Sequence, residues 1–182
     1  FRKGCLRSWN SGLSGARLRL ASTQVRDLTG QPVIEGSSVY LASSVGRMAA
    51  VDLNTGLRIW TAKHGSQGHI LLAGRAVFAV SDTSNLIRLS KDDGTLIWST
   101  PLPKFTKKNL KLRAKIHAHF GPILAGERLI LASSDGLIRQ FNPSDGTLLS
   151  TVELPAGAAS APIVVNGTLY VLNTRGDLLA FR

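Results

Sequence analysis

Cysteine, acidic residues and aromatic residues are all scarce in this sequence of 182 residues. Cys5 is the only cysteine, which excludes an internal disulfide and any metal site built from several thiolates. A single cysteine fits a reducing compartment and also a disulfide-free protein of the periplasm, so it does not decide the compartment. We do not expect Cys5 to carry a lipid, because the residues before it are few and basic, where a signal needs an apolar run.

Long hydrophobic runs are also missing. No stretch approaches about 18 uninterrupted apolar residues, so the sequence predicts no membrane-spanning helix. The first residues, Phe1 to Cys5, contain neither a start methionine nor the apolar region of a signal peptide. We therefore expect the sequence to begin inside a longer chain.

Positive charge is abundant by contrast. The 22 Lys and Arg residues outnumber the 11 Asp and Glu residues and give a formal net charge of +11. A surface of this kind attracts nucleic acid, anionic lipid or an acidic protein face. Charge alone does not choose among these three partners.

The sequence repeats itself. The segments 50–60 and 88–98 align with each other, and both place a glycine four residues before a tryptophan. A third copy at 140–150 keeps the glycine but ends in Ser150. Upstream of the copies, and once more near the C-terminus, an apolar block follows a turn residue; these blocks are Val39–Ala42, Val77–Val80, Leu129–Ala132 and Leu169–Leu172. Periodic self-similarity of this kind is typical of repeat architectures.

Each unit predicts four short strands separated by turns in about 40 residues, which is the pattern of a propeller blade. Apolar residues at consecutive positions indicate burial on both faces, as in a blade stacked between two others. The alternative is a β-sandwich, but a sandwich does not require internal self-similarity. We predict an all-β propeller with blades at 32–66, 67–103, 119–157 and 158–182, the last without its fourth strand, a basic insertion at 104–118, and an N-terminal remnant of a preceding blade and linker at 1–31.

The turn before each last strand predicts how the blades dock. It begins with a short polar residue that can bond nearby backbone N–H groups, namely Asp52, Ser90 or Asn142. The glycines of these turns, Gly56, Gly94 and Gly146, are expected to adopt positive φ. We expect Trp60 and Trp98 to lie flat between neighbouring blades as apolar wedges.

The run A-V-D-L-N-T-G-L-R-I-W at 50–60 resembles the tryptophan-docking motif of PQQ-type propeller repeats. The closing segment, Gly176 to Arg182, is similar to the end of BamB-type lipoproteins, the propeller subunits of the machinery that assembles outer-membrane β-barrels. The resemblance covers roughly residues 32–182 and implies about half of an eight-bladed ring. It further implies a non-enzymatic periplasmic scaffold at the outer membrane. Such a scaffold binds an assembly partner through loops on one face and reaches the membrane only through a lipid anchor outside this chain.

A quinoprotein dehydrogenase is the enzymatic alternative, because it shares the repeat. Such enzymes hold a quinone and Ca²⁺ in a central site, often beside a pair of neighbouring cysteines, and this sequence has no cysteine pair. Its aspartates fall in turns and are not clustered as a Ca²⁺ site requires. His117 and His119 could supply two metal ligands, but no third ligand lies nearby in the sequence, so a solvated loop or a structural hydrogen bond is the simpler interpretation. We predict no catalytic residue, no cofactor and no metal site.

The insertion supplies most of the candidate partner-binding residues, which are Lys104, Phe105, Lys107, Lys108, Lys111 and Arg113. Insertions in repeat proteins map to loops on one face, often the binding face. One interpretation is that basic and apolar side chains together dock onto an acidic protein surface or anionic lipid. The other is a solvated basic loop whose apolar residues pack against a blade. Nucleic acid is less favoured, because the repeated aromatic platform of single-strand binders and a groove-reading helix are both missing.

Arg26 and Asp27, in the loop before Pro32, are the remaining candidates. The resemblance implies an acidic loop with a D-x-D pattern that grips the assembly partner, but Thr29 stands at the second acidic position. An ordinary connecting loop is the alternative.

Finally, three complete blades and a partial one cannot close a ring without unpaired strand edges. We expect these edges to meet another copy, another chain or a further segment.

Overall fold

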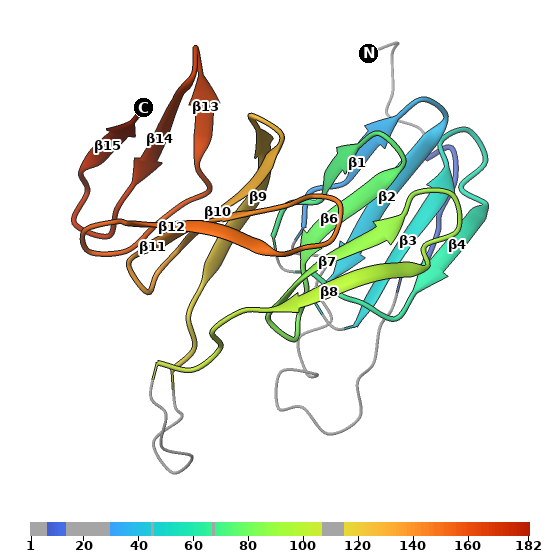
Figure 1. The fold of residues 1–182 in the computed structure, drawn as a ribbon. Helices are drawn as coiled ribbons and strands as arrows, with labels where there is room; N and C mark the ends of the chain where they lie inside the picture. The colour runs from blue at the N-terminus through green and yellow to red at the C-terminus, as the bar shows by residue number, and fades with distance from the viewer. Residues whose placement is uncertain (1–6, 14–29, 45, 67, 107–114) are drawn as a thin grey trace.

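The computed structural model describes residues 7–13, 30–44, 46–66, 68–106 and 115–182. Within these ranges the regular secondary structure is entirely β, which confirms the predicted all-β class. No helix in the described part is long and apolar enough to cross a membrane. The strands form four antiparallel sheets, here called blades 1 to 4, which stand side by side (Figure 1).

Each blade is a meander of consecutive strands. Blade 1 contains β1 (Val33–Glu35), β2 (Ser38–Ser43), β3 (Arg47–Asp52) and β4 (Arg58–Ala62). Blade 2 contains β5 (Leu71–Ala73), β6 (Ala76–Val80), β7 (Asn85–Ser90) and β8 (Leu96–Pro101). Blade 3 contains β9 (His119–Ala125), β10 (Arg128–Ser133), β11 (Leu137–Phe141) and β12 (Leu148–Glu153). Blade 4 contains β13 (Ile163–Val165), β14 (Thr168–Leu172) and β15 (Leu178–Phe181).

The hydrophobic core is divided into three clusters, and each cluster lies between two consecutive blades. The first joins β2, β3 and β4 to β5, β6 and β7, and Met48 at its centre is fully buried. The second joins blades 2 and 3, and the third joins blades 3 and 4. Because the central strands bury both faces, they carry apolar residues at consecutive positions, as the sequence predicted. A blade therefore has no core of its own and is stabilised by its neighbours.

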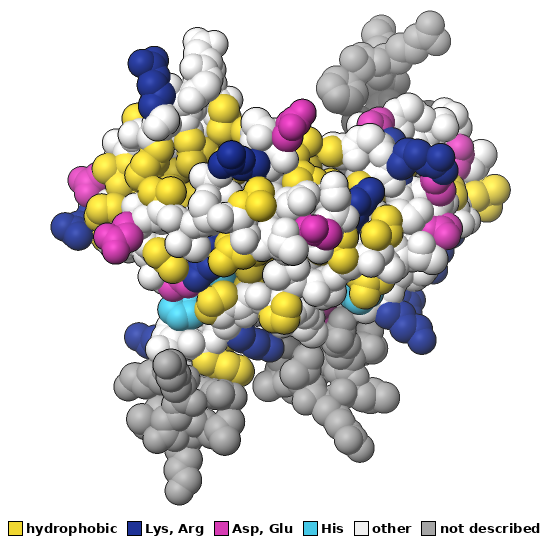
Figure 2. All heavy atoms as spheres, in the orientation of Figure 1, with side chains coloured by type: hydrophobic (Ala, Val, Ile, Leu, Met, Phe, Trp, Pro, Cys, Tyr) yellow, Lys and Arg dark blue, Asp and Glu magenta, His cyan; other side chains and the backbone are white. Residues whose placement is uncertain are grey.

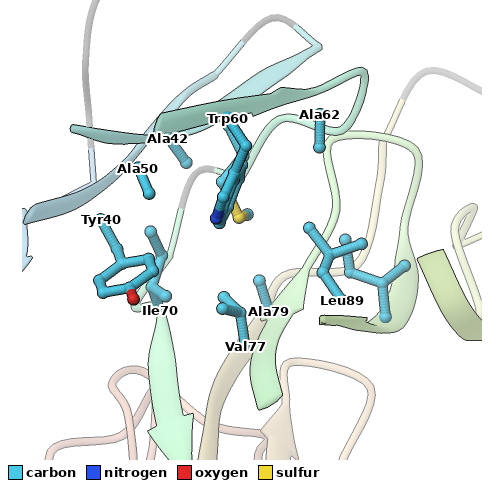
Figure 3. Packing of buried hydrophobic residues seen from close by; sticks show 11 residues of the cluster. Tyr40, Ala42, Ala50, Trp60, Ala62, Ile70, Val77, Ala79 and Leu89 are labelled. Atoms are coloured by element: carbon cyan, nitrogen blue, oxygen red, sulfur yellow. The ribbon is translucent and has the colours of Figure 1, made fainter. Parts of the chain in front are cut away.

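Trp60 is the wedge of the first junction. It extends from β4 into the cluster between blades 1 and 2, beside Tyr40, whose ring centroid is 6.0 Å from the indole (Figure 3). The indole covers Gly94 of blade 2 so closely that an added Cβ there would lie 2.5 Å from Cε3. The indole Nε1–H donates to the carbonyl of Lys91 at 2.8 Å. The wedge therefore spans two blades through one apolar and one polar contact.

The same arrangement occurs at two more places. Trp98 covers Gly146 of blade 3 and donates to the carbonyl of Pro143 at 3.1 Å. Trp9, in the N-terminal segment, covers Gly56 of blade 1 and donates to the carbonyl of Leu53 at 2.8 Å. Sequence reasoning did not single out Trp9, because residues 7–13 form no strand and lack the repeat motif around it.

The turns that receive the indoles are held by carboxylates. The Asp52 Oδ1 atom accepts hydrogen bonds from the backbone N–H groups of Asn54 and Thr55 at 3.0 and 2.8 Å, and from the Thr55 hydroxyl at 2.8 Å. The hydroxyl bond is the largest cause of a lowered pKa of Asp52. Asp93 and Asp145 stand directly before the glycines of their turns, and each accepts from the backbone N–H and the hydroxyl of the threonine that follows its glycine. The aspartates of this repeat therefore shape the turns.

Gly94→Ala tests the wedge against a matched control, Gly74→Ala. Both glycines have positive φ, of 72° and 57°, so alanine costs about 1–2 kcal/mol of backbone strain at either position. Only Gly94 lies beneath an indole; nothing is within 4 Å of an added Cβ at Gly74. We expect Gly94→Ala to lower the free energy of unfolding by about 1–3 kcal/mol more than Gly74→Ala does, measured by urea denaturation. Equal losses would show that the indole contact contributes nothing.

Candidate interaction face

The two ends of the blades differ in the length of their connections. At one end lie short turns, among them Gly74 and Arg75 between β5 and β6. At the other end lie all the connections between blades, together with the β2–β3, β6–β7, β10–β11 and β14–β15 loops. We call this second end the loop face and define it by the described residues 44, 46, 63–66, 68–70, 81–84, 102–106, 115–118, 134–136, 154–162 and 173–177. The first end is called the turn face.

The two described ends of the insertion leave the loop face side by side, and we call them the hairpin base. They pair antiparallel through a bridge between Phe105 and Ile116. The Thr106 N–H donates to the carbonyl of Lys115 at 3.1 Å, and the His117 N–H donates to the carbonyl of Lys104 at 2.8 Å. Phe105 and Ile116 remain 36% and 58% exposed. The base of the insertion is therefore a paired ribbon with an apolar surface.

Lys104 and Phe105, both predicted to bind a partner, lie together at this base. The Lys104 ammonium stands 5.6 Å from the centre of the Phe105 ring, within the range of a cation–π contact. Figure 2 shows basic and histidine side chains along the lower edge of the molecule, where residues 102–106 and 115–118 leave the sheets in Figure 1. The other predicted partner-binding residues, namely Arg26, Asp27, Lys107, Lys108, Lys111 and Arg113, lie outside the described residues.

His119 anchors the hairpin to blade 3. Its Nε2–H donates to the carbonyl of Pro103 at 2.8 Å, which leaves Nδ1 to accept from the Ser133 hydroxyl at 2.7 Å. Ala118 adds a bond from its N–H to the Ser134 hydroxyl at 2.9 Å. Of the two interpretations open for His119, a solvated loop and a structural hydrogen bond, the geometry shows the second. The histidine joins the start of β9 to the arm that leads into the insertion.

Behind His119 lies a buried ion pair. The Arg139 guanidinium on β11 donates from Nη1 to Asp135 Oδ1 at 3.1 Å and from Nη2 to the second carboxylate oxygen. Nη1 also donates to the Ser133 hydroxyl at 3.0 Å, which links the pair to His119. The two charged side chains are only 8% and 12% exposed. Because a buried charge is costly without a partner, each of them depends on the other.

This environment sets the charge of His119. Burial is the main cause of the lowered pKa of His119, and the nearby Arg139 and His117 lower this pKa further. The Pro103 carbonyl and Asp135 raise it, but by less. Burial alone would raise the pKa of Asp135, but the hydrogen bond and charge of Arg139 lower it overall. At neutral pH the network therefore contains a neutral histidine, an ionised aspartate and a charged arginine.

A hollow of about 280 Å³ lies beside the hairpin base. Lys104, Ile116 and His117 line it from the hairpin, and Ser81 and Asp82 line it from the β6–β7 loop, together with Gly68, Val80, Ser84, Ala118, His119 and Phe120. Basic, acidic, hydroxyl and apolar groups thus converge on one side of the loop face. Such a mixture can hold a polar segment of another macromolecule by hydrogen bonds and apolar contact. The predicted docking residues, Trp60 and Trp98, are elsewhere, in the interior of the blade junctions.

His119→Gln tests the pH dependence of the anchor. The pKa of His119 is lowered in the folded chain, so the unfolded chain binds the proton more readily. The stability due to neutral His119 is therefore complete above the unfolded pKa of about 6.5 and is lost as the pH falls through the lower folded value. We expect the free energy of unfolding to fall less between about pH 7.5 and 5 in His119→Gln than in the unchanged chain, measured by urea denaturation. Parallel curves would contradict the lowered pKa.

Comparison with known proteins supports the sequence resemblance. A family model described as outer membrane protein assembly factor BamB matches residues 3–100 and 86–182. The factor of this name from Alkalilimnicola ehrlichii is 27% identical over 177 residues, which is 96% of this chain and 43% of the relative. The one from Shewanella oneidensis is 26% identical over 157 residues, 86% of this chain and 37% of the relative. The chain thus spans less than half the length of these relatives.

Solved structures show the same fold. BamB from Moraxella catarrhalis superposes with a TM-score of 0.73 at 20% identity, covering 92% of this chain and 47% of that one. A computationally designed protein, Ika4, gives 0.69 at 11% identity and covers 98% of both chains. A quinohemoprotein alcohol dehydrogenase from Comamonas testosteroni gives 0.64 at 15% identity, covering 92% of this chain and 30% of that one. The predicted propeller fold is confirmed, and the match of the family model along the sequence shows that this chain belongs to the family of outer membrane protein assembly factor BamB.

Proposed function

We propose that this chain is part of a non-enzymatic scaffold that assists the assembly of β-barrel proteins into the outer membrane, and that its loop face binds the partner. The proposal is supported first by the family, whose members carry the name outer membrane protein assembly factor. On this proposal the protein works in the periplasm beside the outer membrane. It is held there by a lipid anchor outside this chain.

The loop face is the observation that carries the proposal. The interiors of the junctions between blades 1 and 2 and between blades 2 and 3 are closed by an indole and an apolar cluster, so they stabilise the fold and leave little for a partner to contact. The hairpin base, in contrast, combines exposed Phe105 and Ile116 with Lys104 and a neighbouring hollow. The insertion continues from this base through Lys107, Lys108, Lys111 and Arg113 in the sequence. This composition favours an acidic protein surface with an apolar centre.

The enzymatic alternative rests on the fold shared with the quinohemoprotein alcohol dehydrogenase. The described aspartates do not favour it, because their carboxylates have structural partners. Asp52, Asp93 and Asp145 bond their own turns, and Asp135 pairs with Arg139. A Ca²⁺ site needs several carboxylate or carbonyl oxygens directed at one point. The arrangement therefore supports a binding module.

The open strand edges are part of the same proposal. Among the described residues, β15 pairs with β14 on one side and is the last strand of its sheet on the other. An unpaired edge of this kind is a template for another strand. In the proposed assembly the edge meets a further segment of the longer chain, a second copy or another propeller fragment.

A double substitution, Lys104→Glu with Phe105→Ala, tests the loop face. The probe is the purified periplasmic region of an outer-membrane β-barrel assembly protein, and binding is measured by isothermal titration calorimetry. We expect the double variant to bind about tenfold or more weakly, because it removes an apolar contact and reverses a charge at the hairpin base.

The matched control is Arg75→Glu on the turn face, which reverses a charge far from the hairpin. Arg75 is highly exposed and pairs with Asp92, so its substitution is expected to leave binding unchanged. Equal binding by the double variant and the control would show that the loop face is not the contact surface.

Reduction of an electron acceptor in the presence of PQQ and Ca²⁺ would overturn the non-enzymatic role. If the chain bound DNA as tightly as it binds the assembly protein, and this affinity fell steeply with salt, a general anion-binding role would be favoured instead.

A further inference from the structure

The junction between blades 3 and 4 lacks the wedge that the other junctions have. In the strand register, Trp60 pairs with Ala50 and Trp98 pairs with Arg88. The equivalent pair in blade 3 is Ser150 with Gln140. A hydroxymethyl group therefore stands where the other blades place an indole.

A cavity of about 480 Å³ opens at this junction. Six of its apolar lining residues are the register equivalents of residues in the cluster around Trp60 in the first junction. They are Ile130, Ile138, Val152, Val164, Leu169 and Phe181, which correspond to Tyr40, Met48, Ala62, Leu72, Val77 and Leu89. Val152 is 38% exposed, whereas Ala62, beside the indole, is only 7% exposed. The cavity is thus the space that a wedge would fill.

The junction between blades 2 and 3 provides the comparison. A groove of about 510 Å³ lies there too, but its lining stops at Phe78 and Arg88, and Arg88 extends to the carbonyls of Pro143 and Ser144 on its far side. The deeper positions are closed by Trp98, and both Leu129 and Phe141 are at most 2% exposed. Their equivalents at the third junction, Leu169 and Phe181, are partly exposed. Loss of the indole therefore coincides with an inward extension of the groove.

The rim of the cavity is positively charged. Arg128 and Arg182 line it, and its lining contains no acidic side chain. Arg128 donates to the Gln140 amide oxygen at 2.8 Å, which holds the guanidinium over the opening without neutralising its charge. In Figure 2 hydrophobic side chains gather on the visible face between β13 and β9, where these two blades meet in Figure 1. A cavity with an apolar inner lining and a basic rim suits an aromatic group next to a carboxylate.

We propose that the cavity between blades 3 and 4 is a binding site for an extended segment of a partner protein that inserts an aromatic side chain flanked by acidic residues. The aromatic ring takes the place of the missing indole against Leu169, Phe181 and Ile138. The carboxylates of the flanking residues bond the guanidinium groups of Arg128 and Arg182. The site is separate from the loop face, and neither proposal depends on the other.

Ser150→Trp tests the site by filling it from within. We expect the new indole to raise the melting temperature by about 2–4 °C, because it buries apolar surface in an existing space. The control is Thr151→Trp, on the opposite face of the same strand, where the ring stays exposed and no rise is expected. The cavity would not fit an indole if Ser150→Trp lowered the melting temperature while Thr151→Trp left it unchanged.

The binding probe is the peptide Gly-Asp-Trp-Asp-Gly with blocked ends, titrated into the full 182-residue chain and followed by NMR chemical shifts. We expect Ser150→Trp to weaken binding at least tenfold and Thr151→Trp to leave it unchanged. Replacement of the peptide tryptophan by alanine should weaken binding at least tenfold as well. Arg128→Gln, a rim substitution that leaves the apolar lining intact, should weaken it about two- to fivefold, as should the peptide with both acids replaced by asparagine.

Three results would overturn the proposal. The first is peptide binding that Ser150→Trp leaves unchanged, or no binding at all. The second is self-association that Ser150→Trp abolishes, because the occupant would then be a second copy of this chain. The third is tighter binding of a peptide that copies residues 52–62, because the occupant would then be a fourth strand added to β15. Shifts confined to Leu169, Phe181, Arg128 and their neighbours would support the proposed segment.

Discussion

The indole of one blade lying on a glycine of the next is the contact on which the rest of this structure depends. It occurs with Trp9, Trp60 and Trp98, and each indole also donates to a carbonyl of the receiving turn. Every apolar cluster lies between blades, so no blade is stabilised alone. Truncation of a buried tryptophan typically costs about 3–5 kcal/mol, which is a large part of the stability of a domain. The requirement for glycine follows from the same contact, because a Cβ would displace the ring.

The parts of the molecule that stabilise the fold differ from those available for recognition. The junctions hold the blades in one stack, and that stack places every connection between blades on the loop face. His119 and the Arg139–Asp135 pair then tie the insertion to blade 3, so its base is a paired ribbon. Where a wedge is missing, as at Ser150, a junction ceases to be purely structural and becomes a cavity. The same repeat can therefore supply a framework at two junctions and a binding surface at the third.

Much of the fold was predictable because its signals are local. The spacing of glycine and tryptophan, the polar residue that opens each turn and the apolar blocks all repeat within a few residues of one another. Trp9 was missed because its partner, Gly56, is far away in sequence and its own surroundings form no strand. The Arg139–Asp135 pair was missed because two opposite charges four residues apart are unremarkable on a surface strand. Only burial shows that each needs the other.

The candidate site was predicted less completely. Lys104 and Phe105 were expected to act together, and they lie at one hairpin base, but the role of His119 in fixing that base depends on Pro103 and Ser133, which belong to different elements. The sequence by itself determined the blade, because strand, turn and wedge are encoded by neighbouring residues. The tertiary structure decided which glycine each indole covers, which charges are buried and where a cavity opens. Those properties arise between blades, from pairs of residues that no local pattern connects.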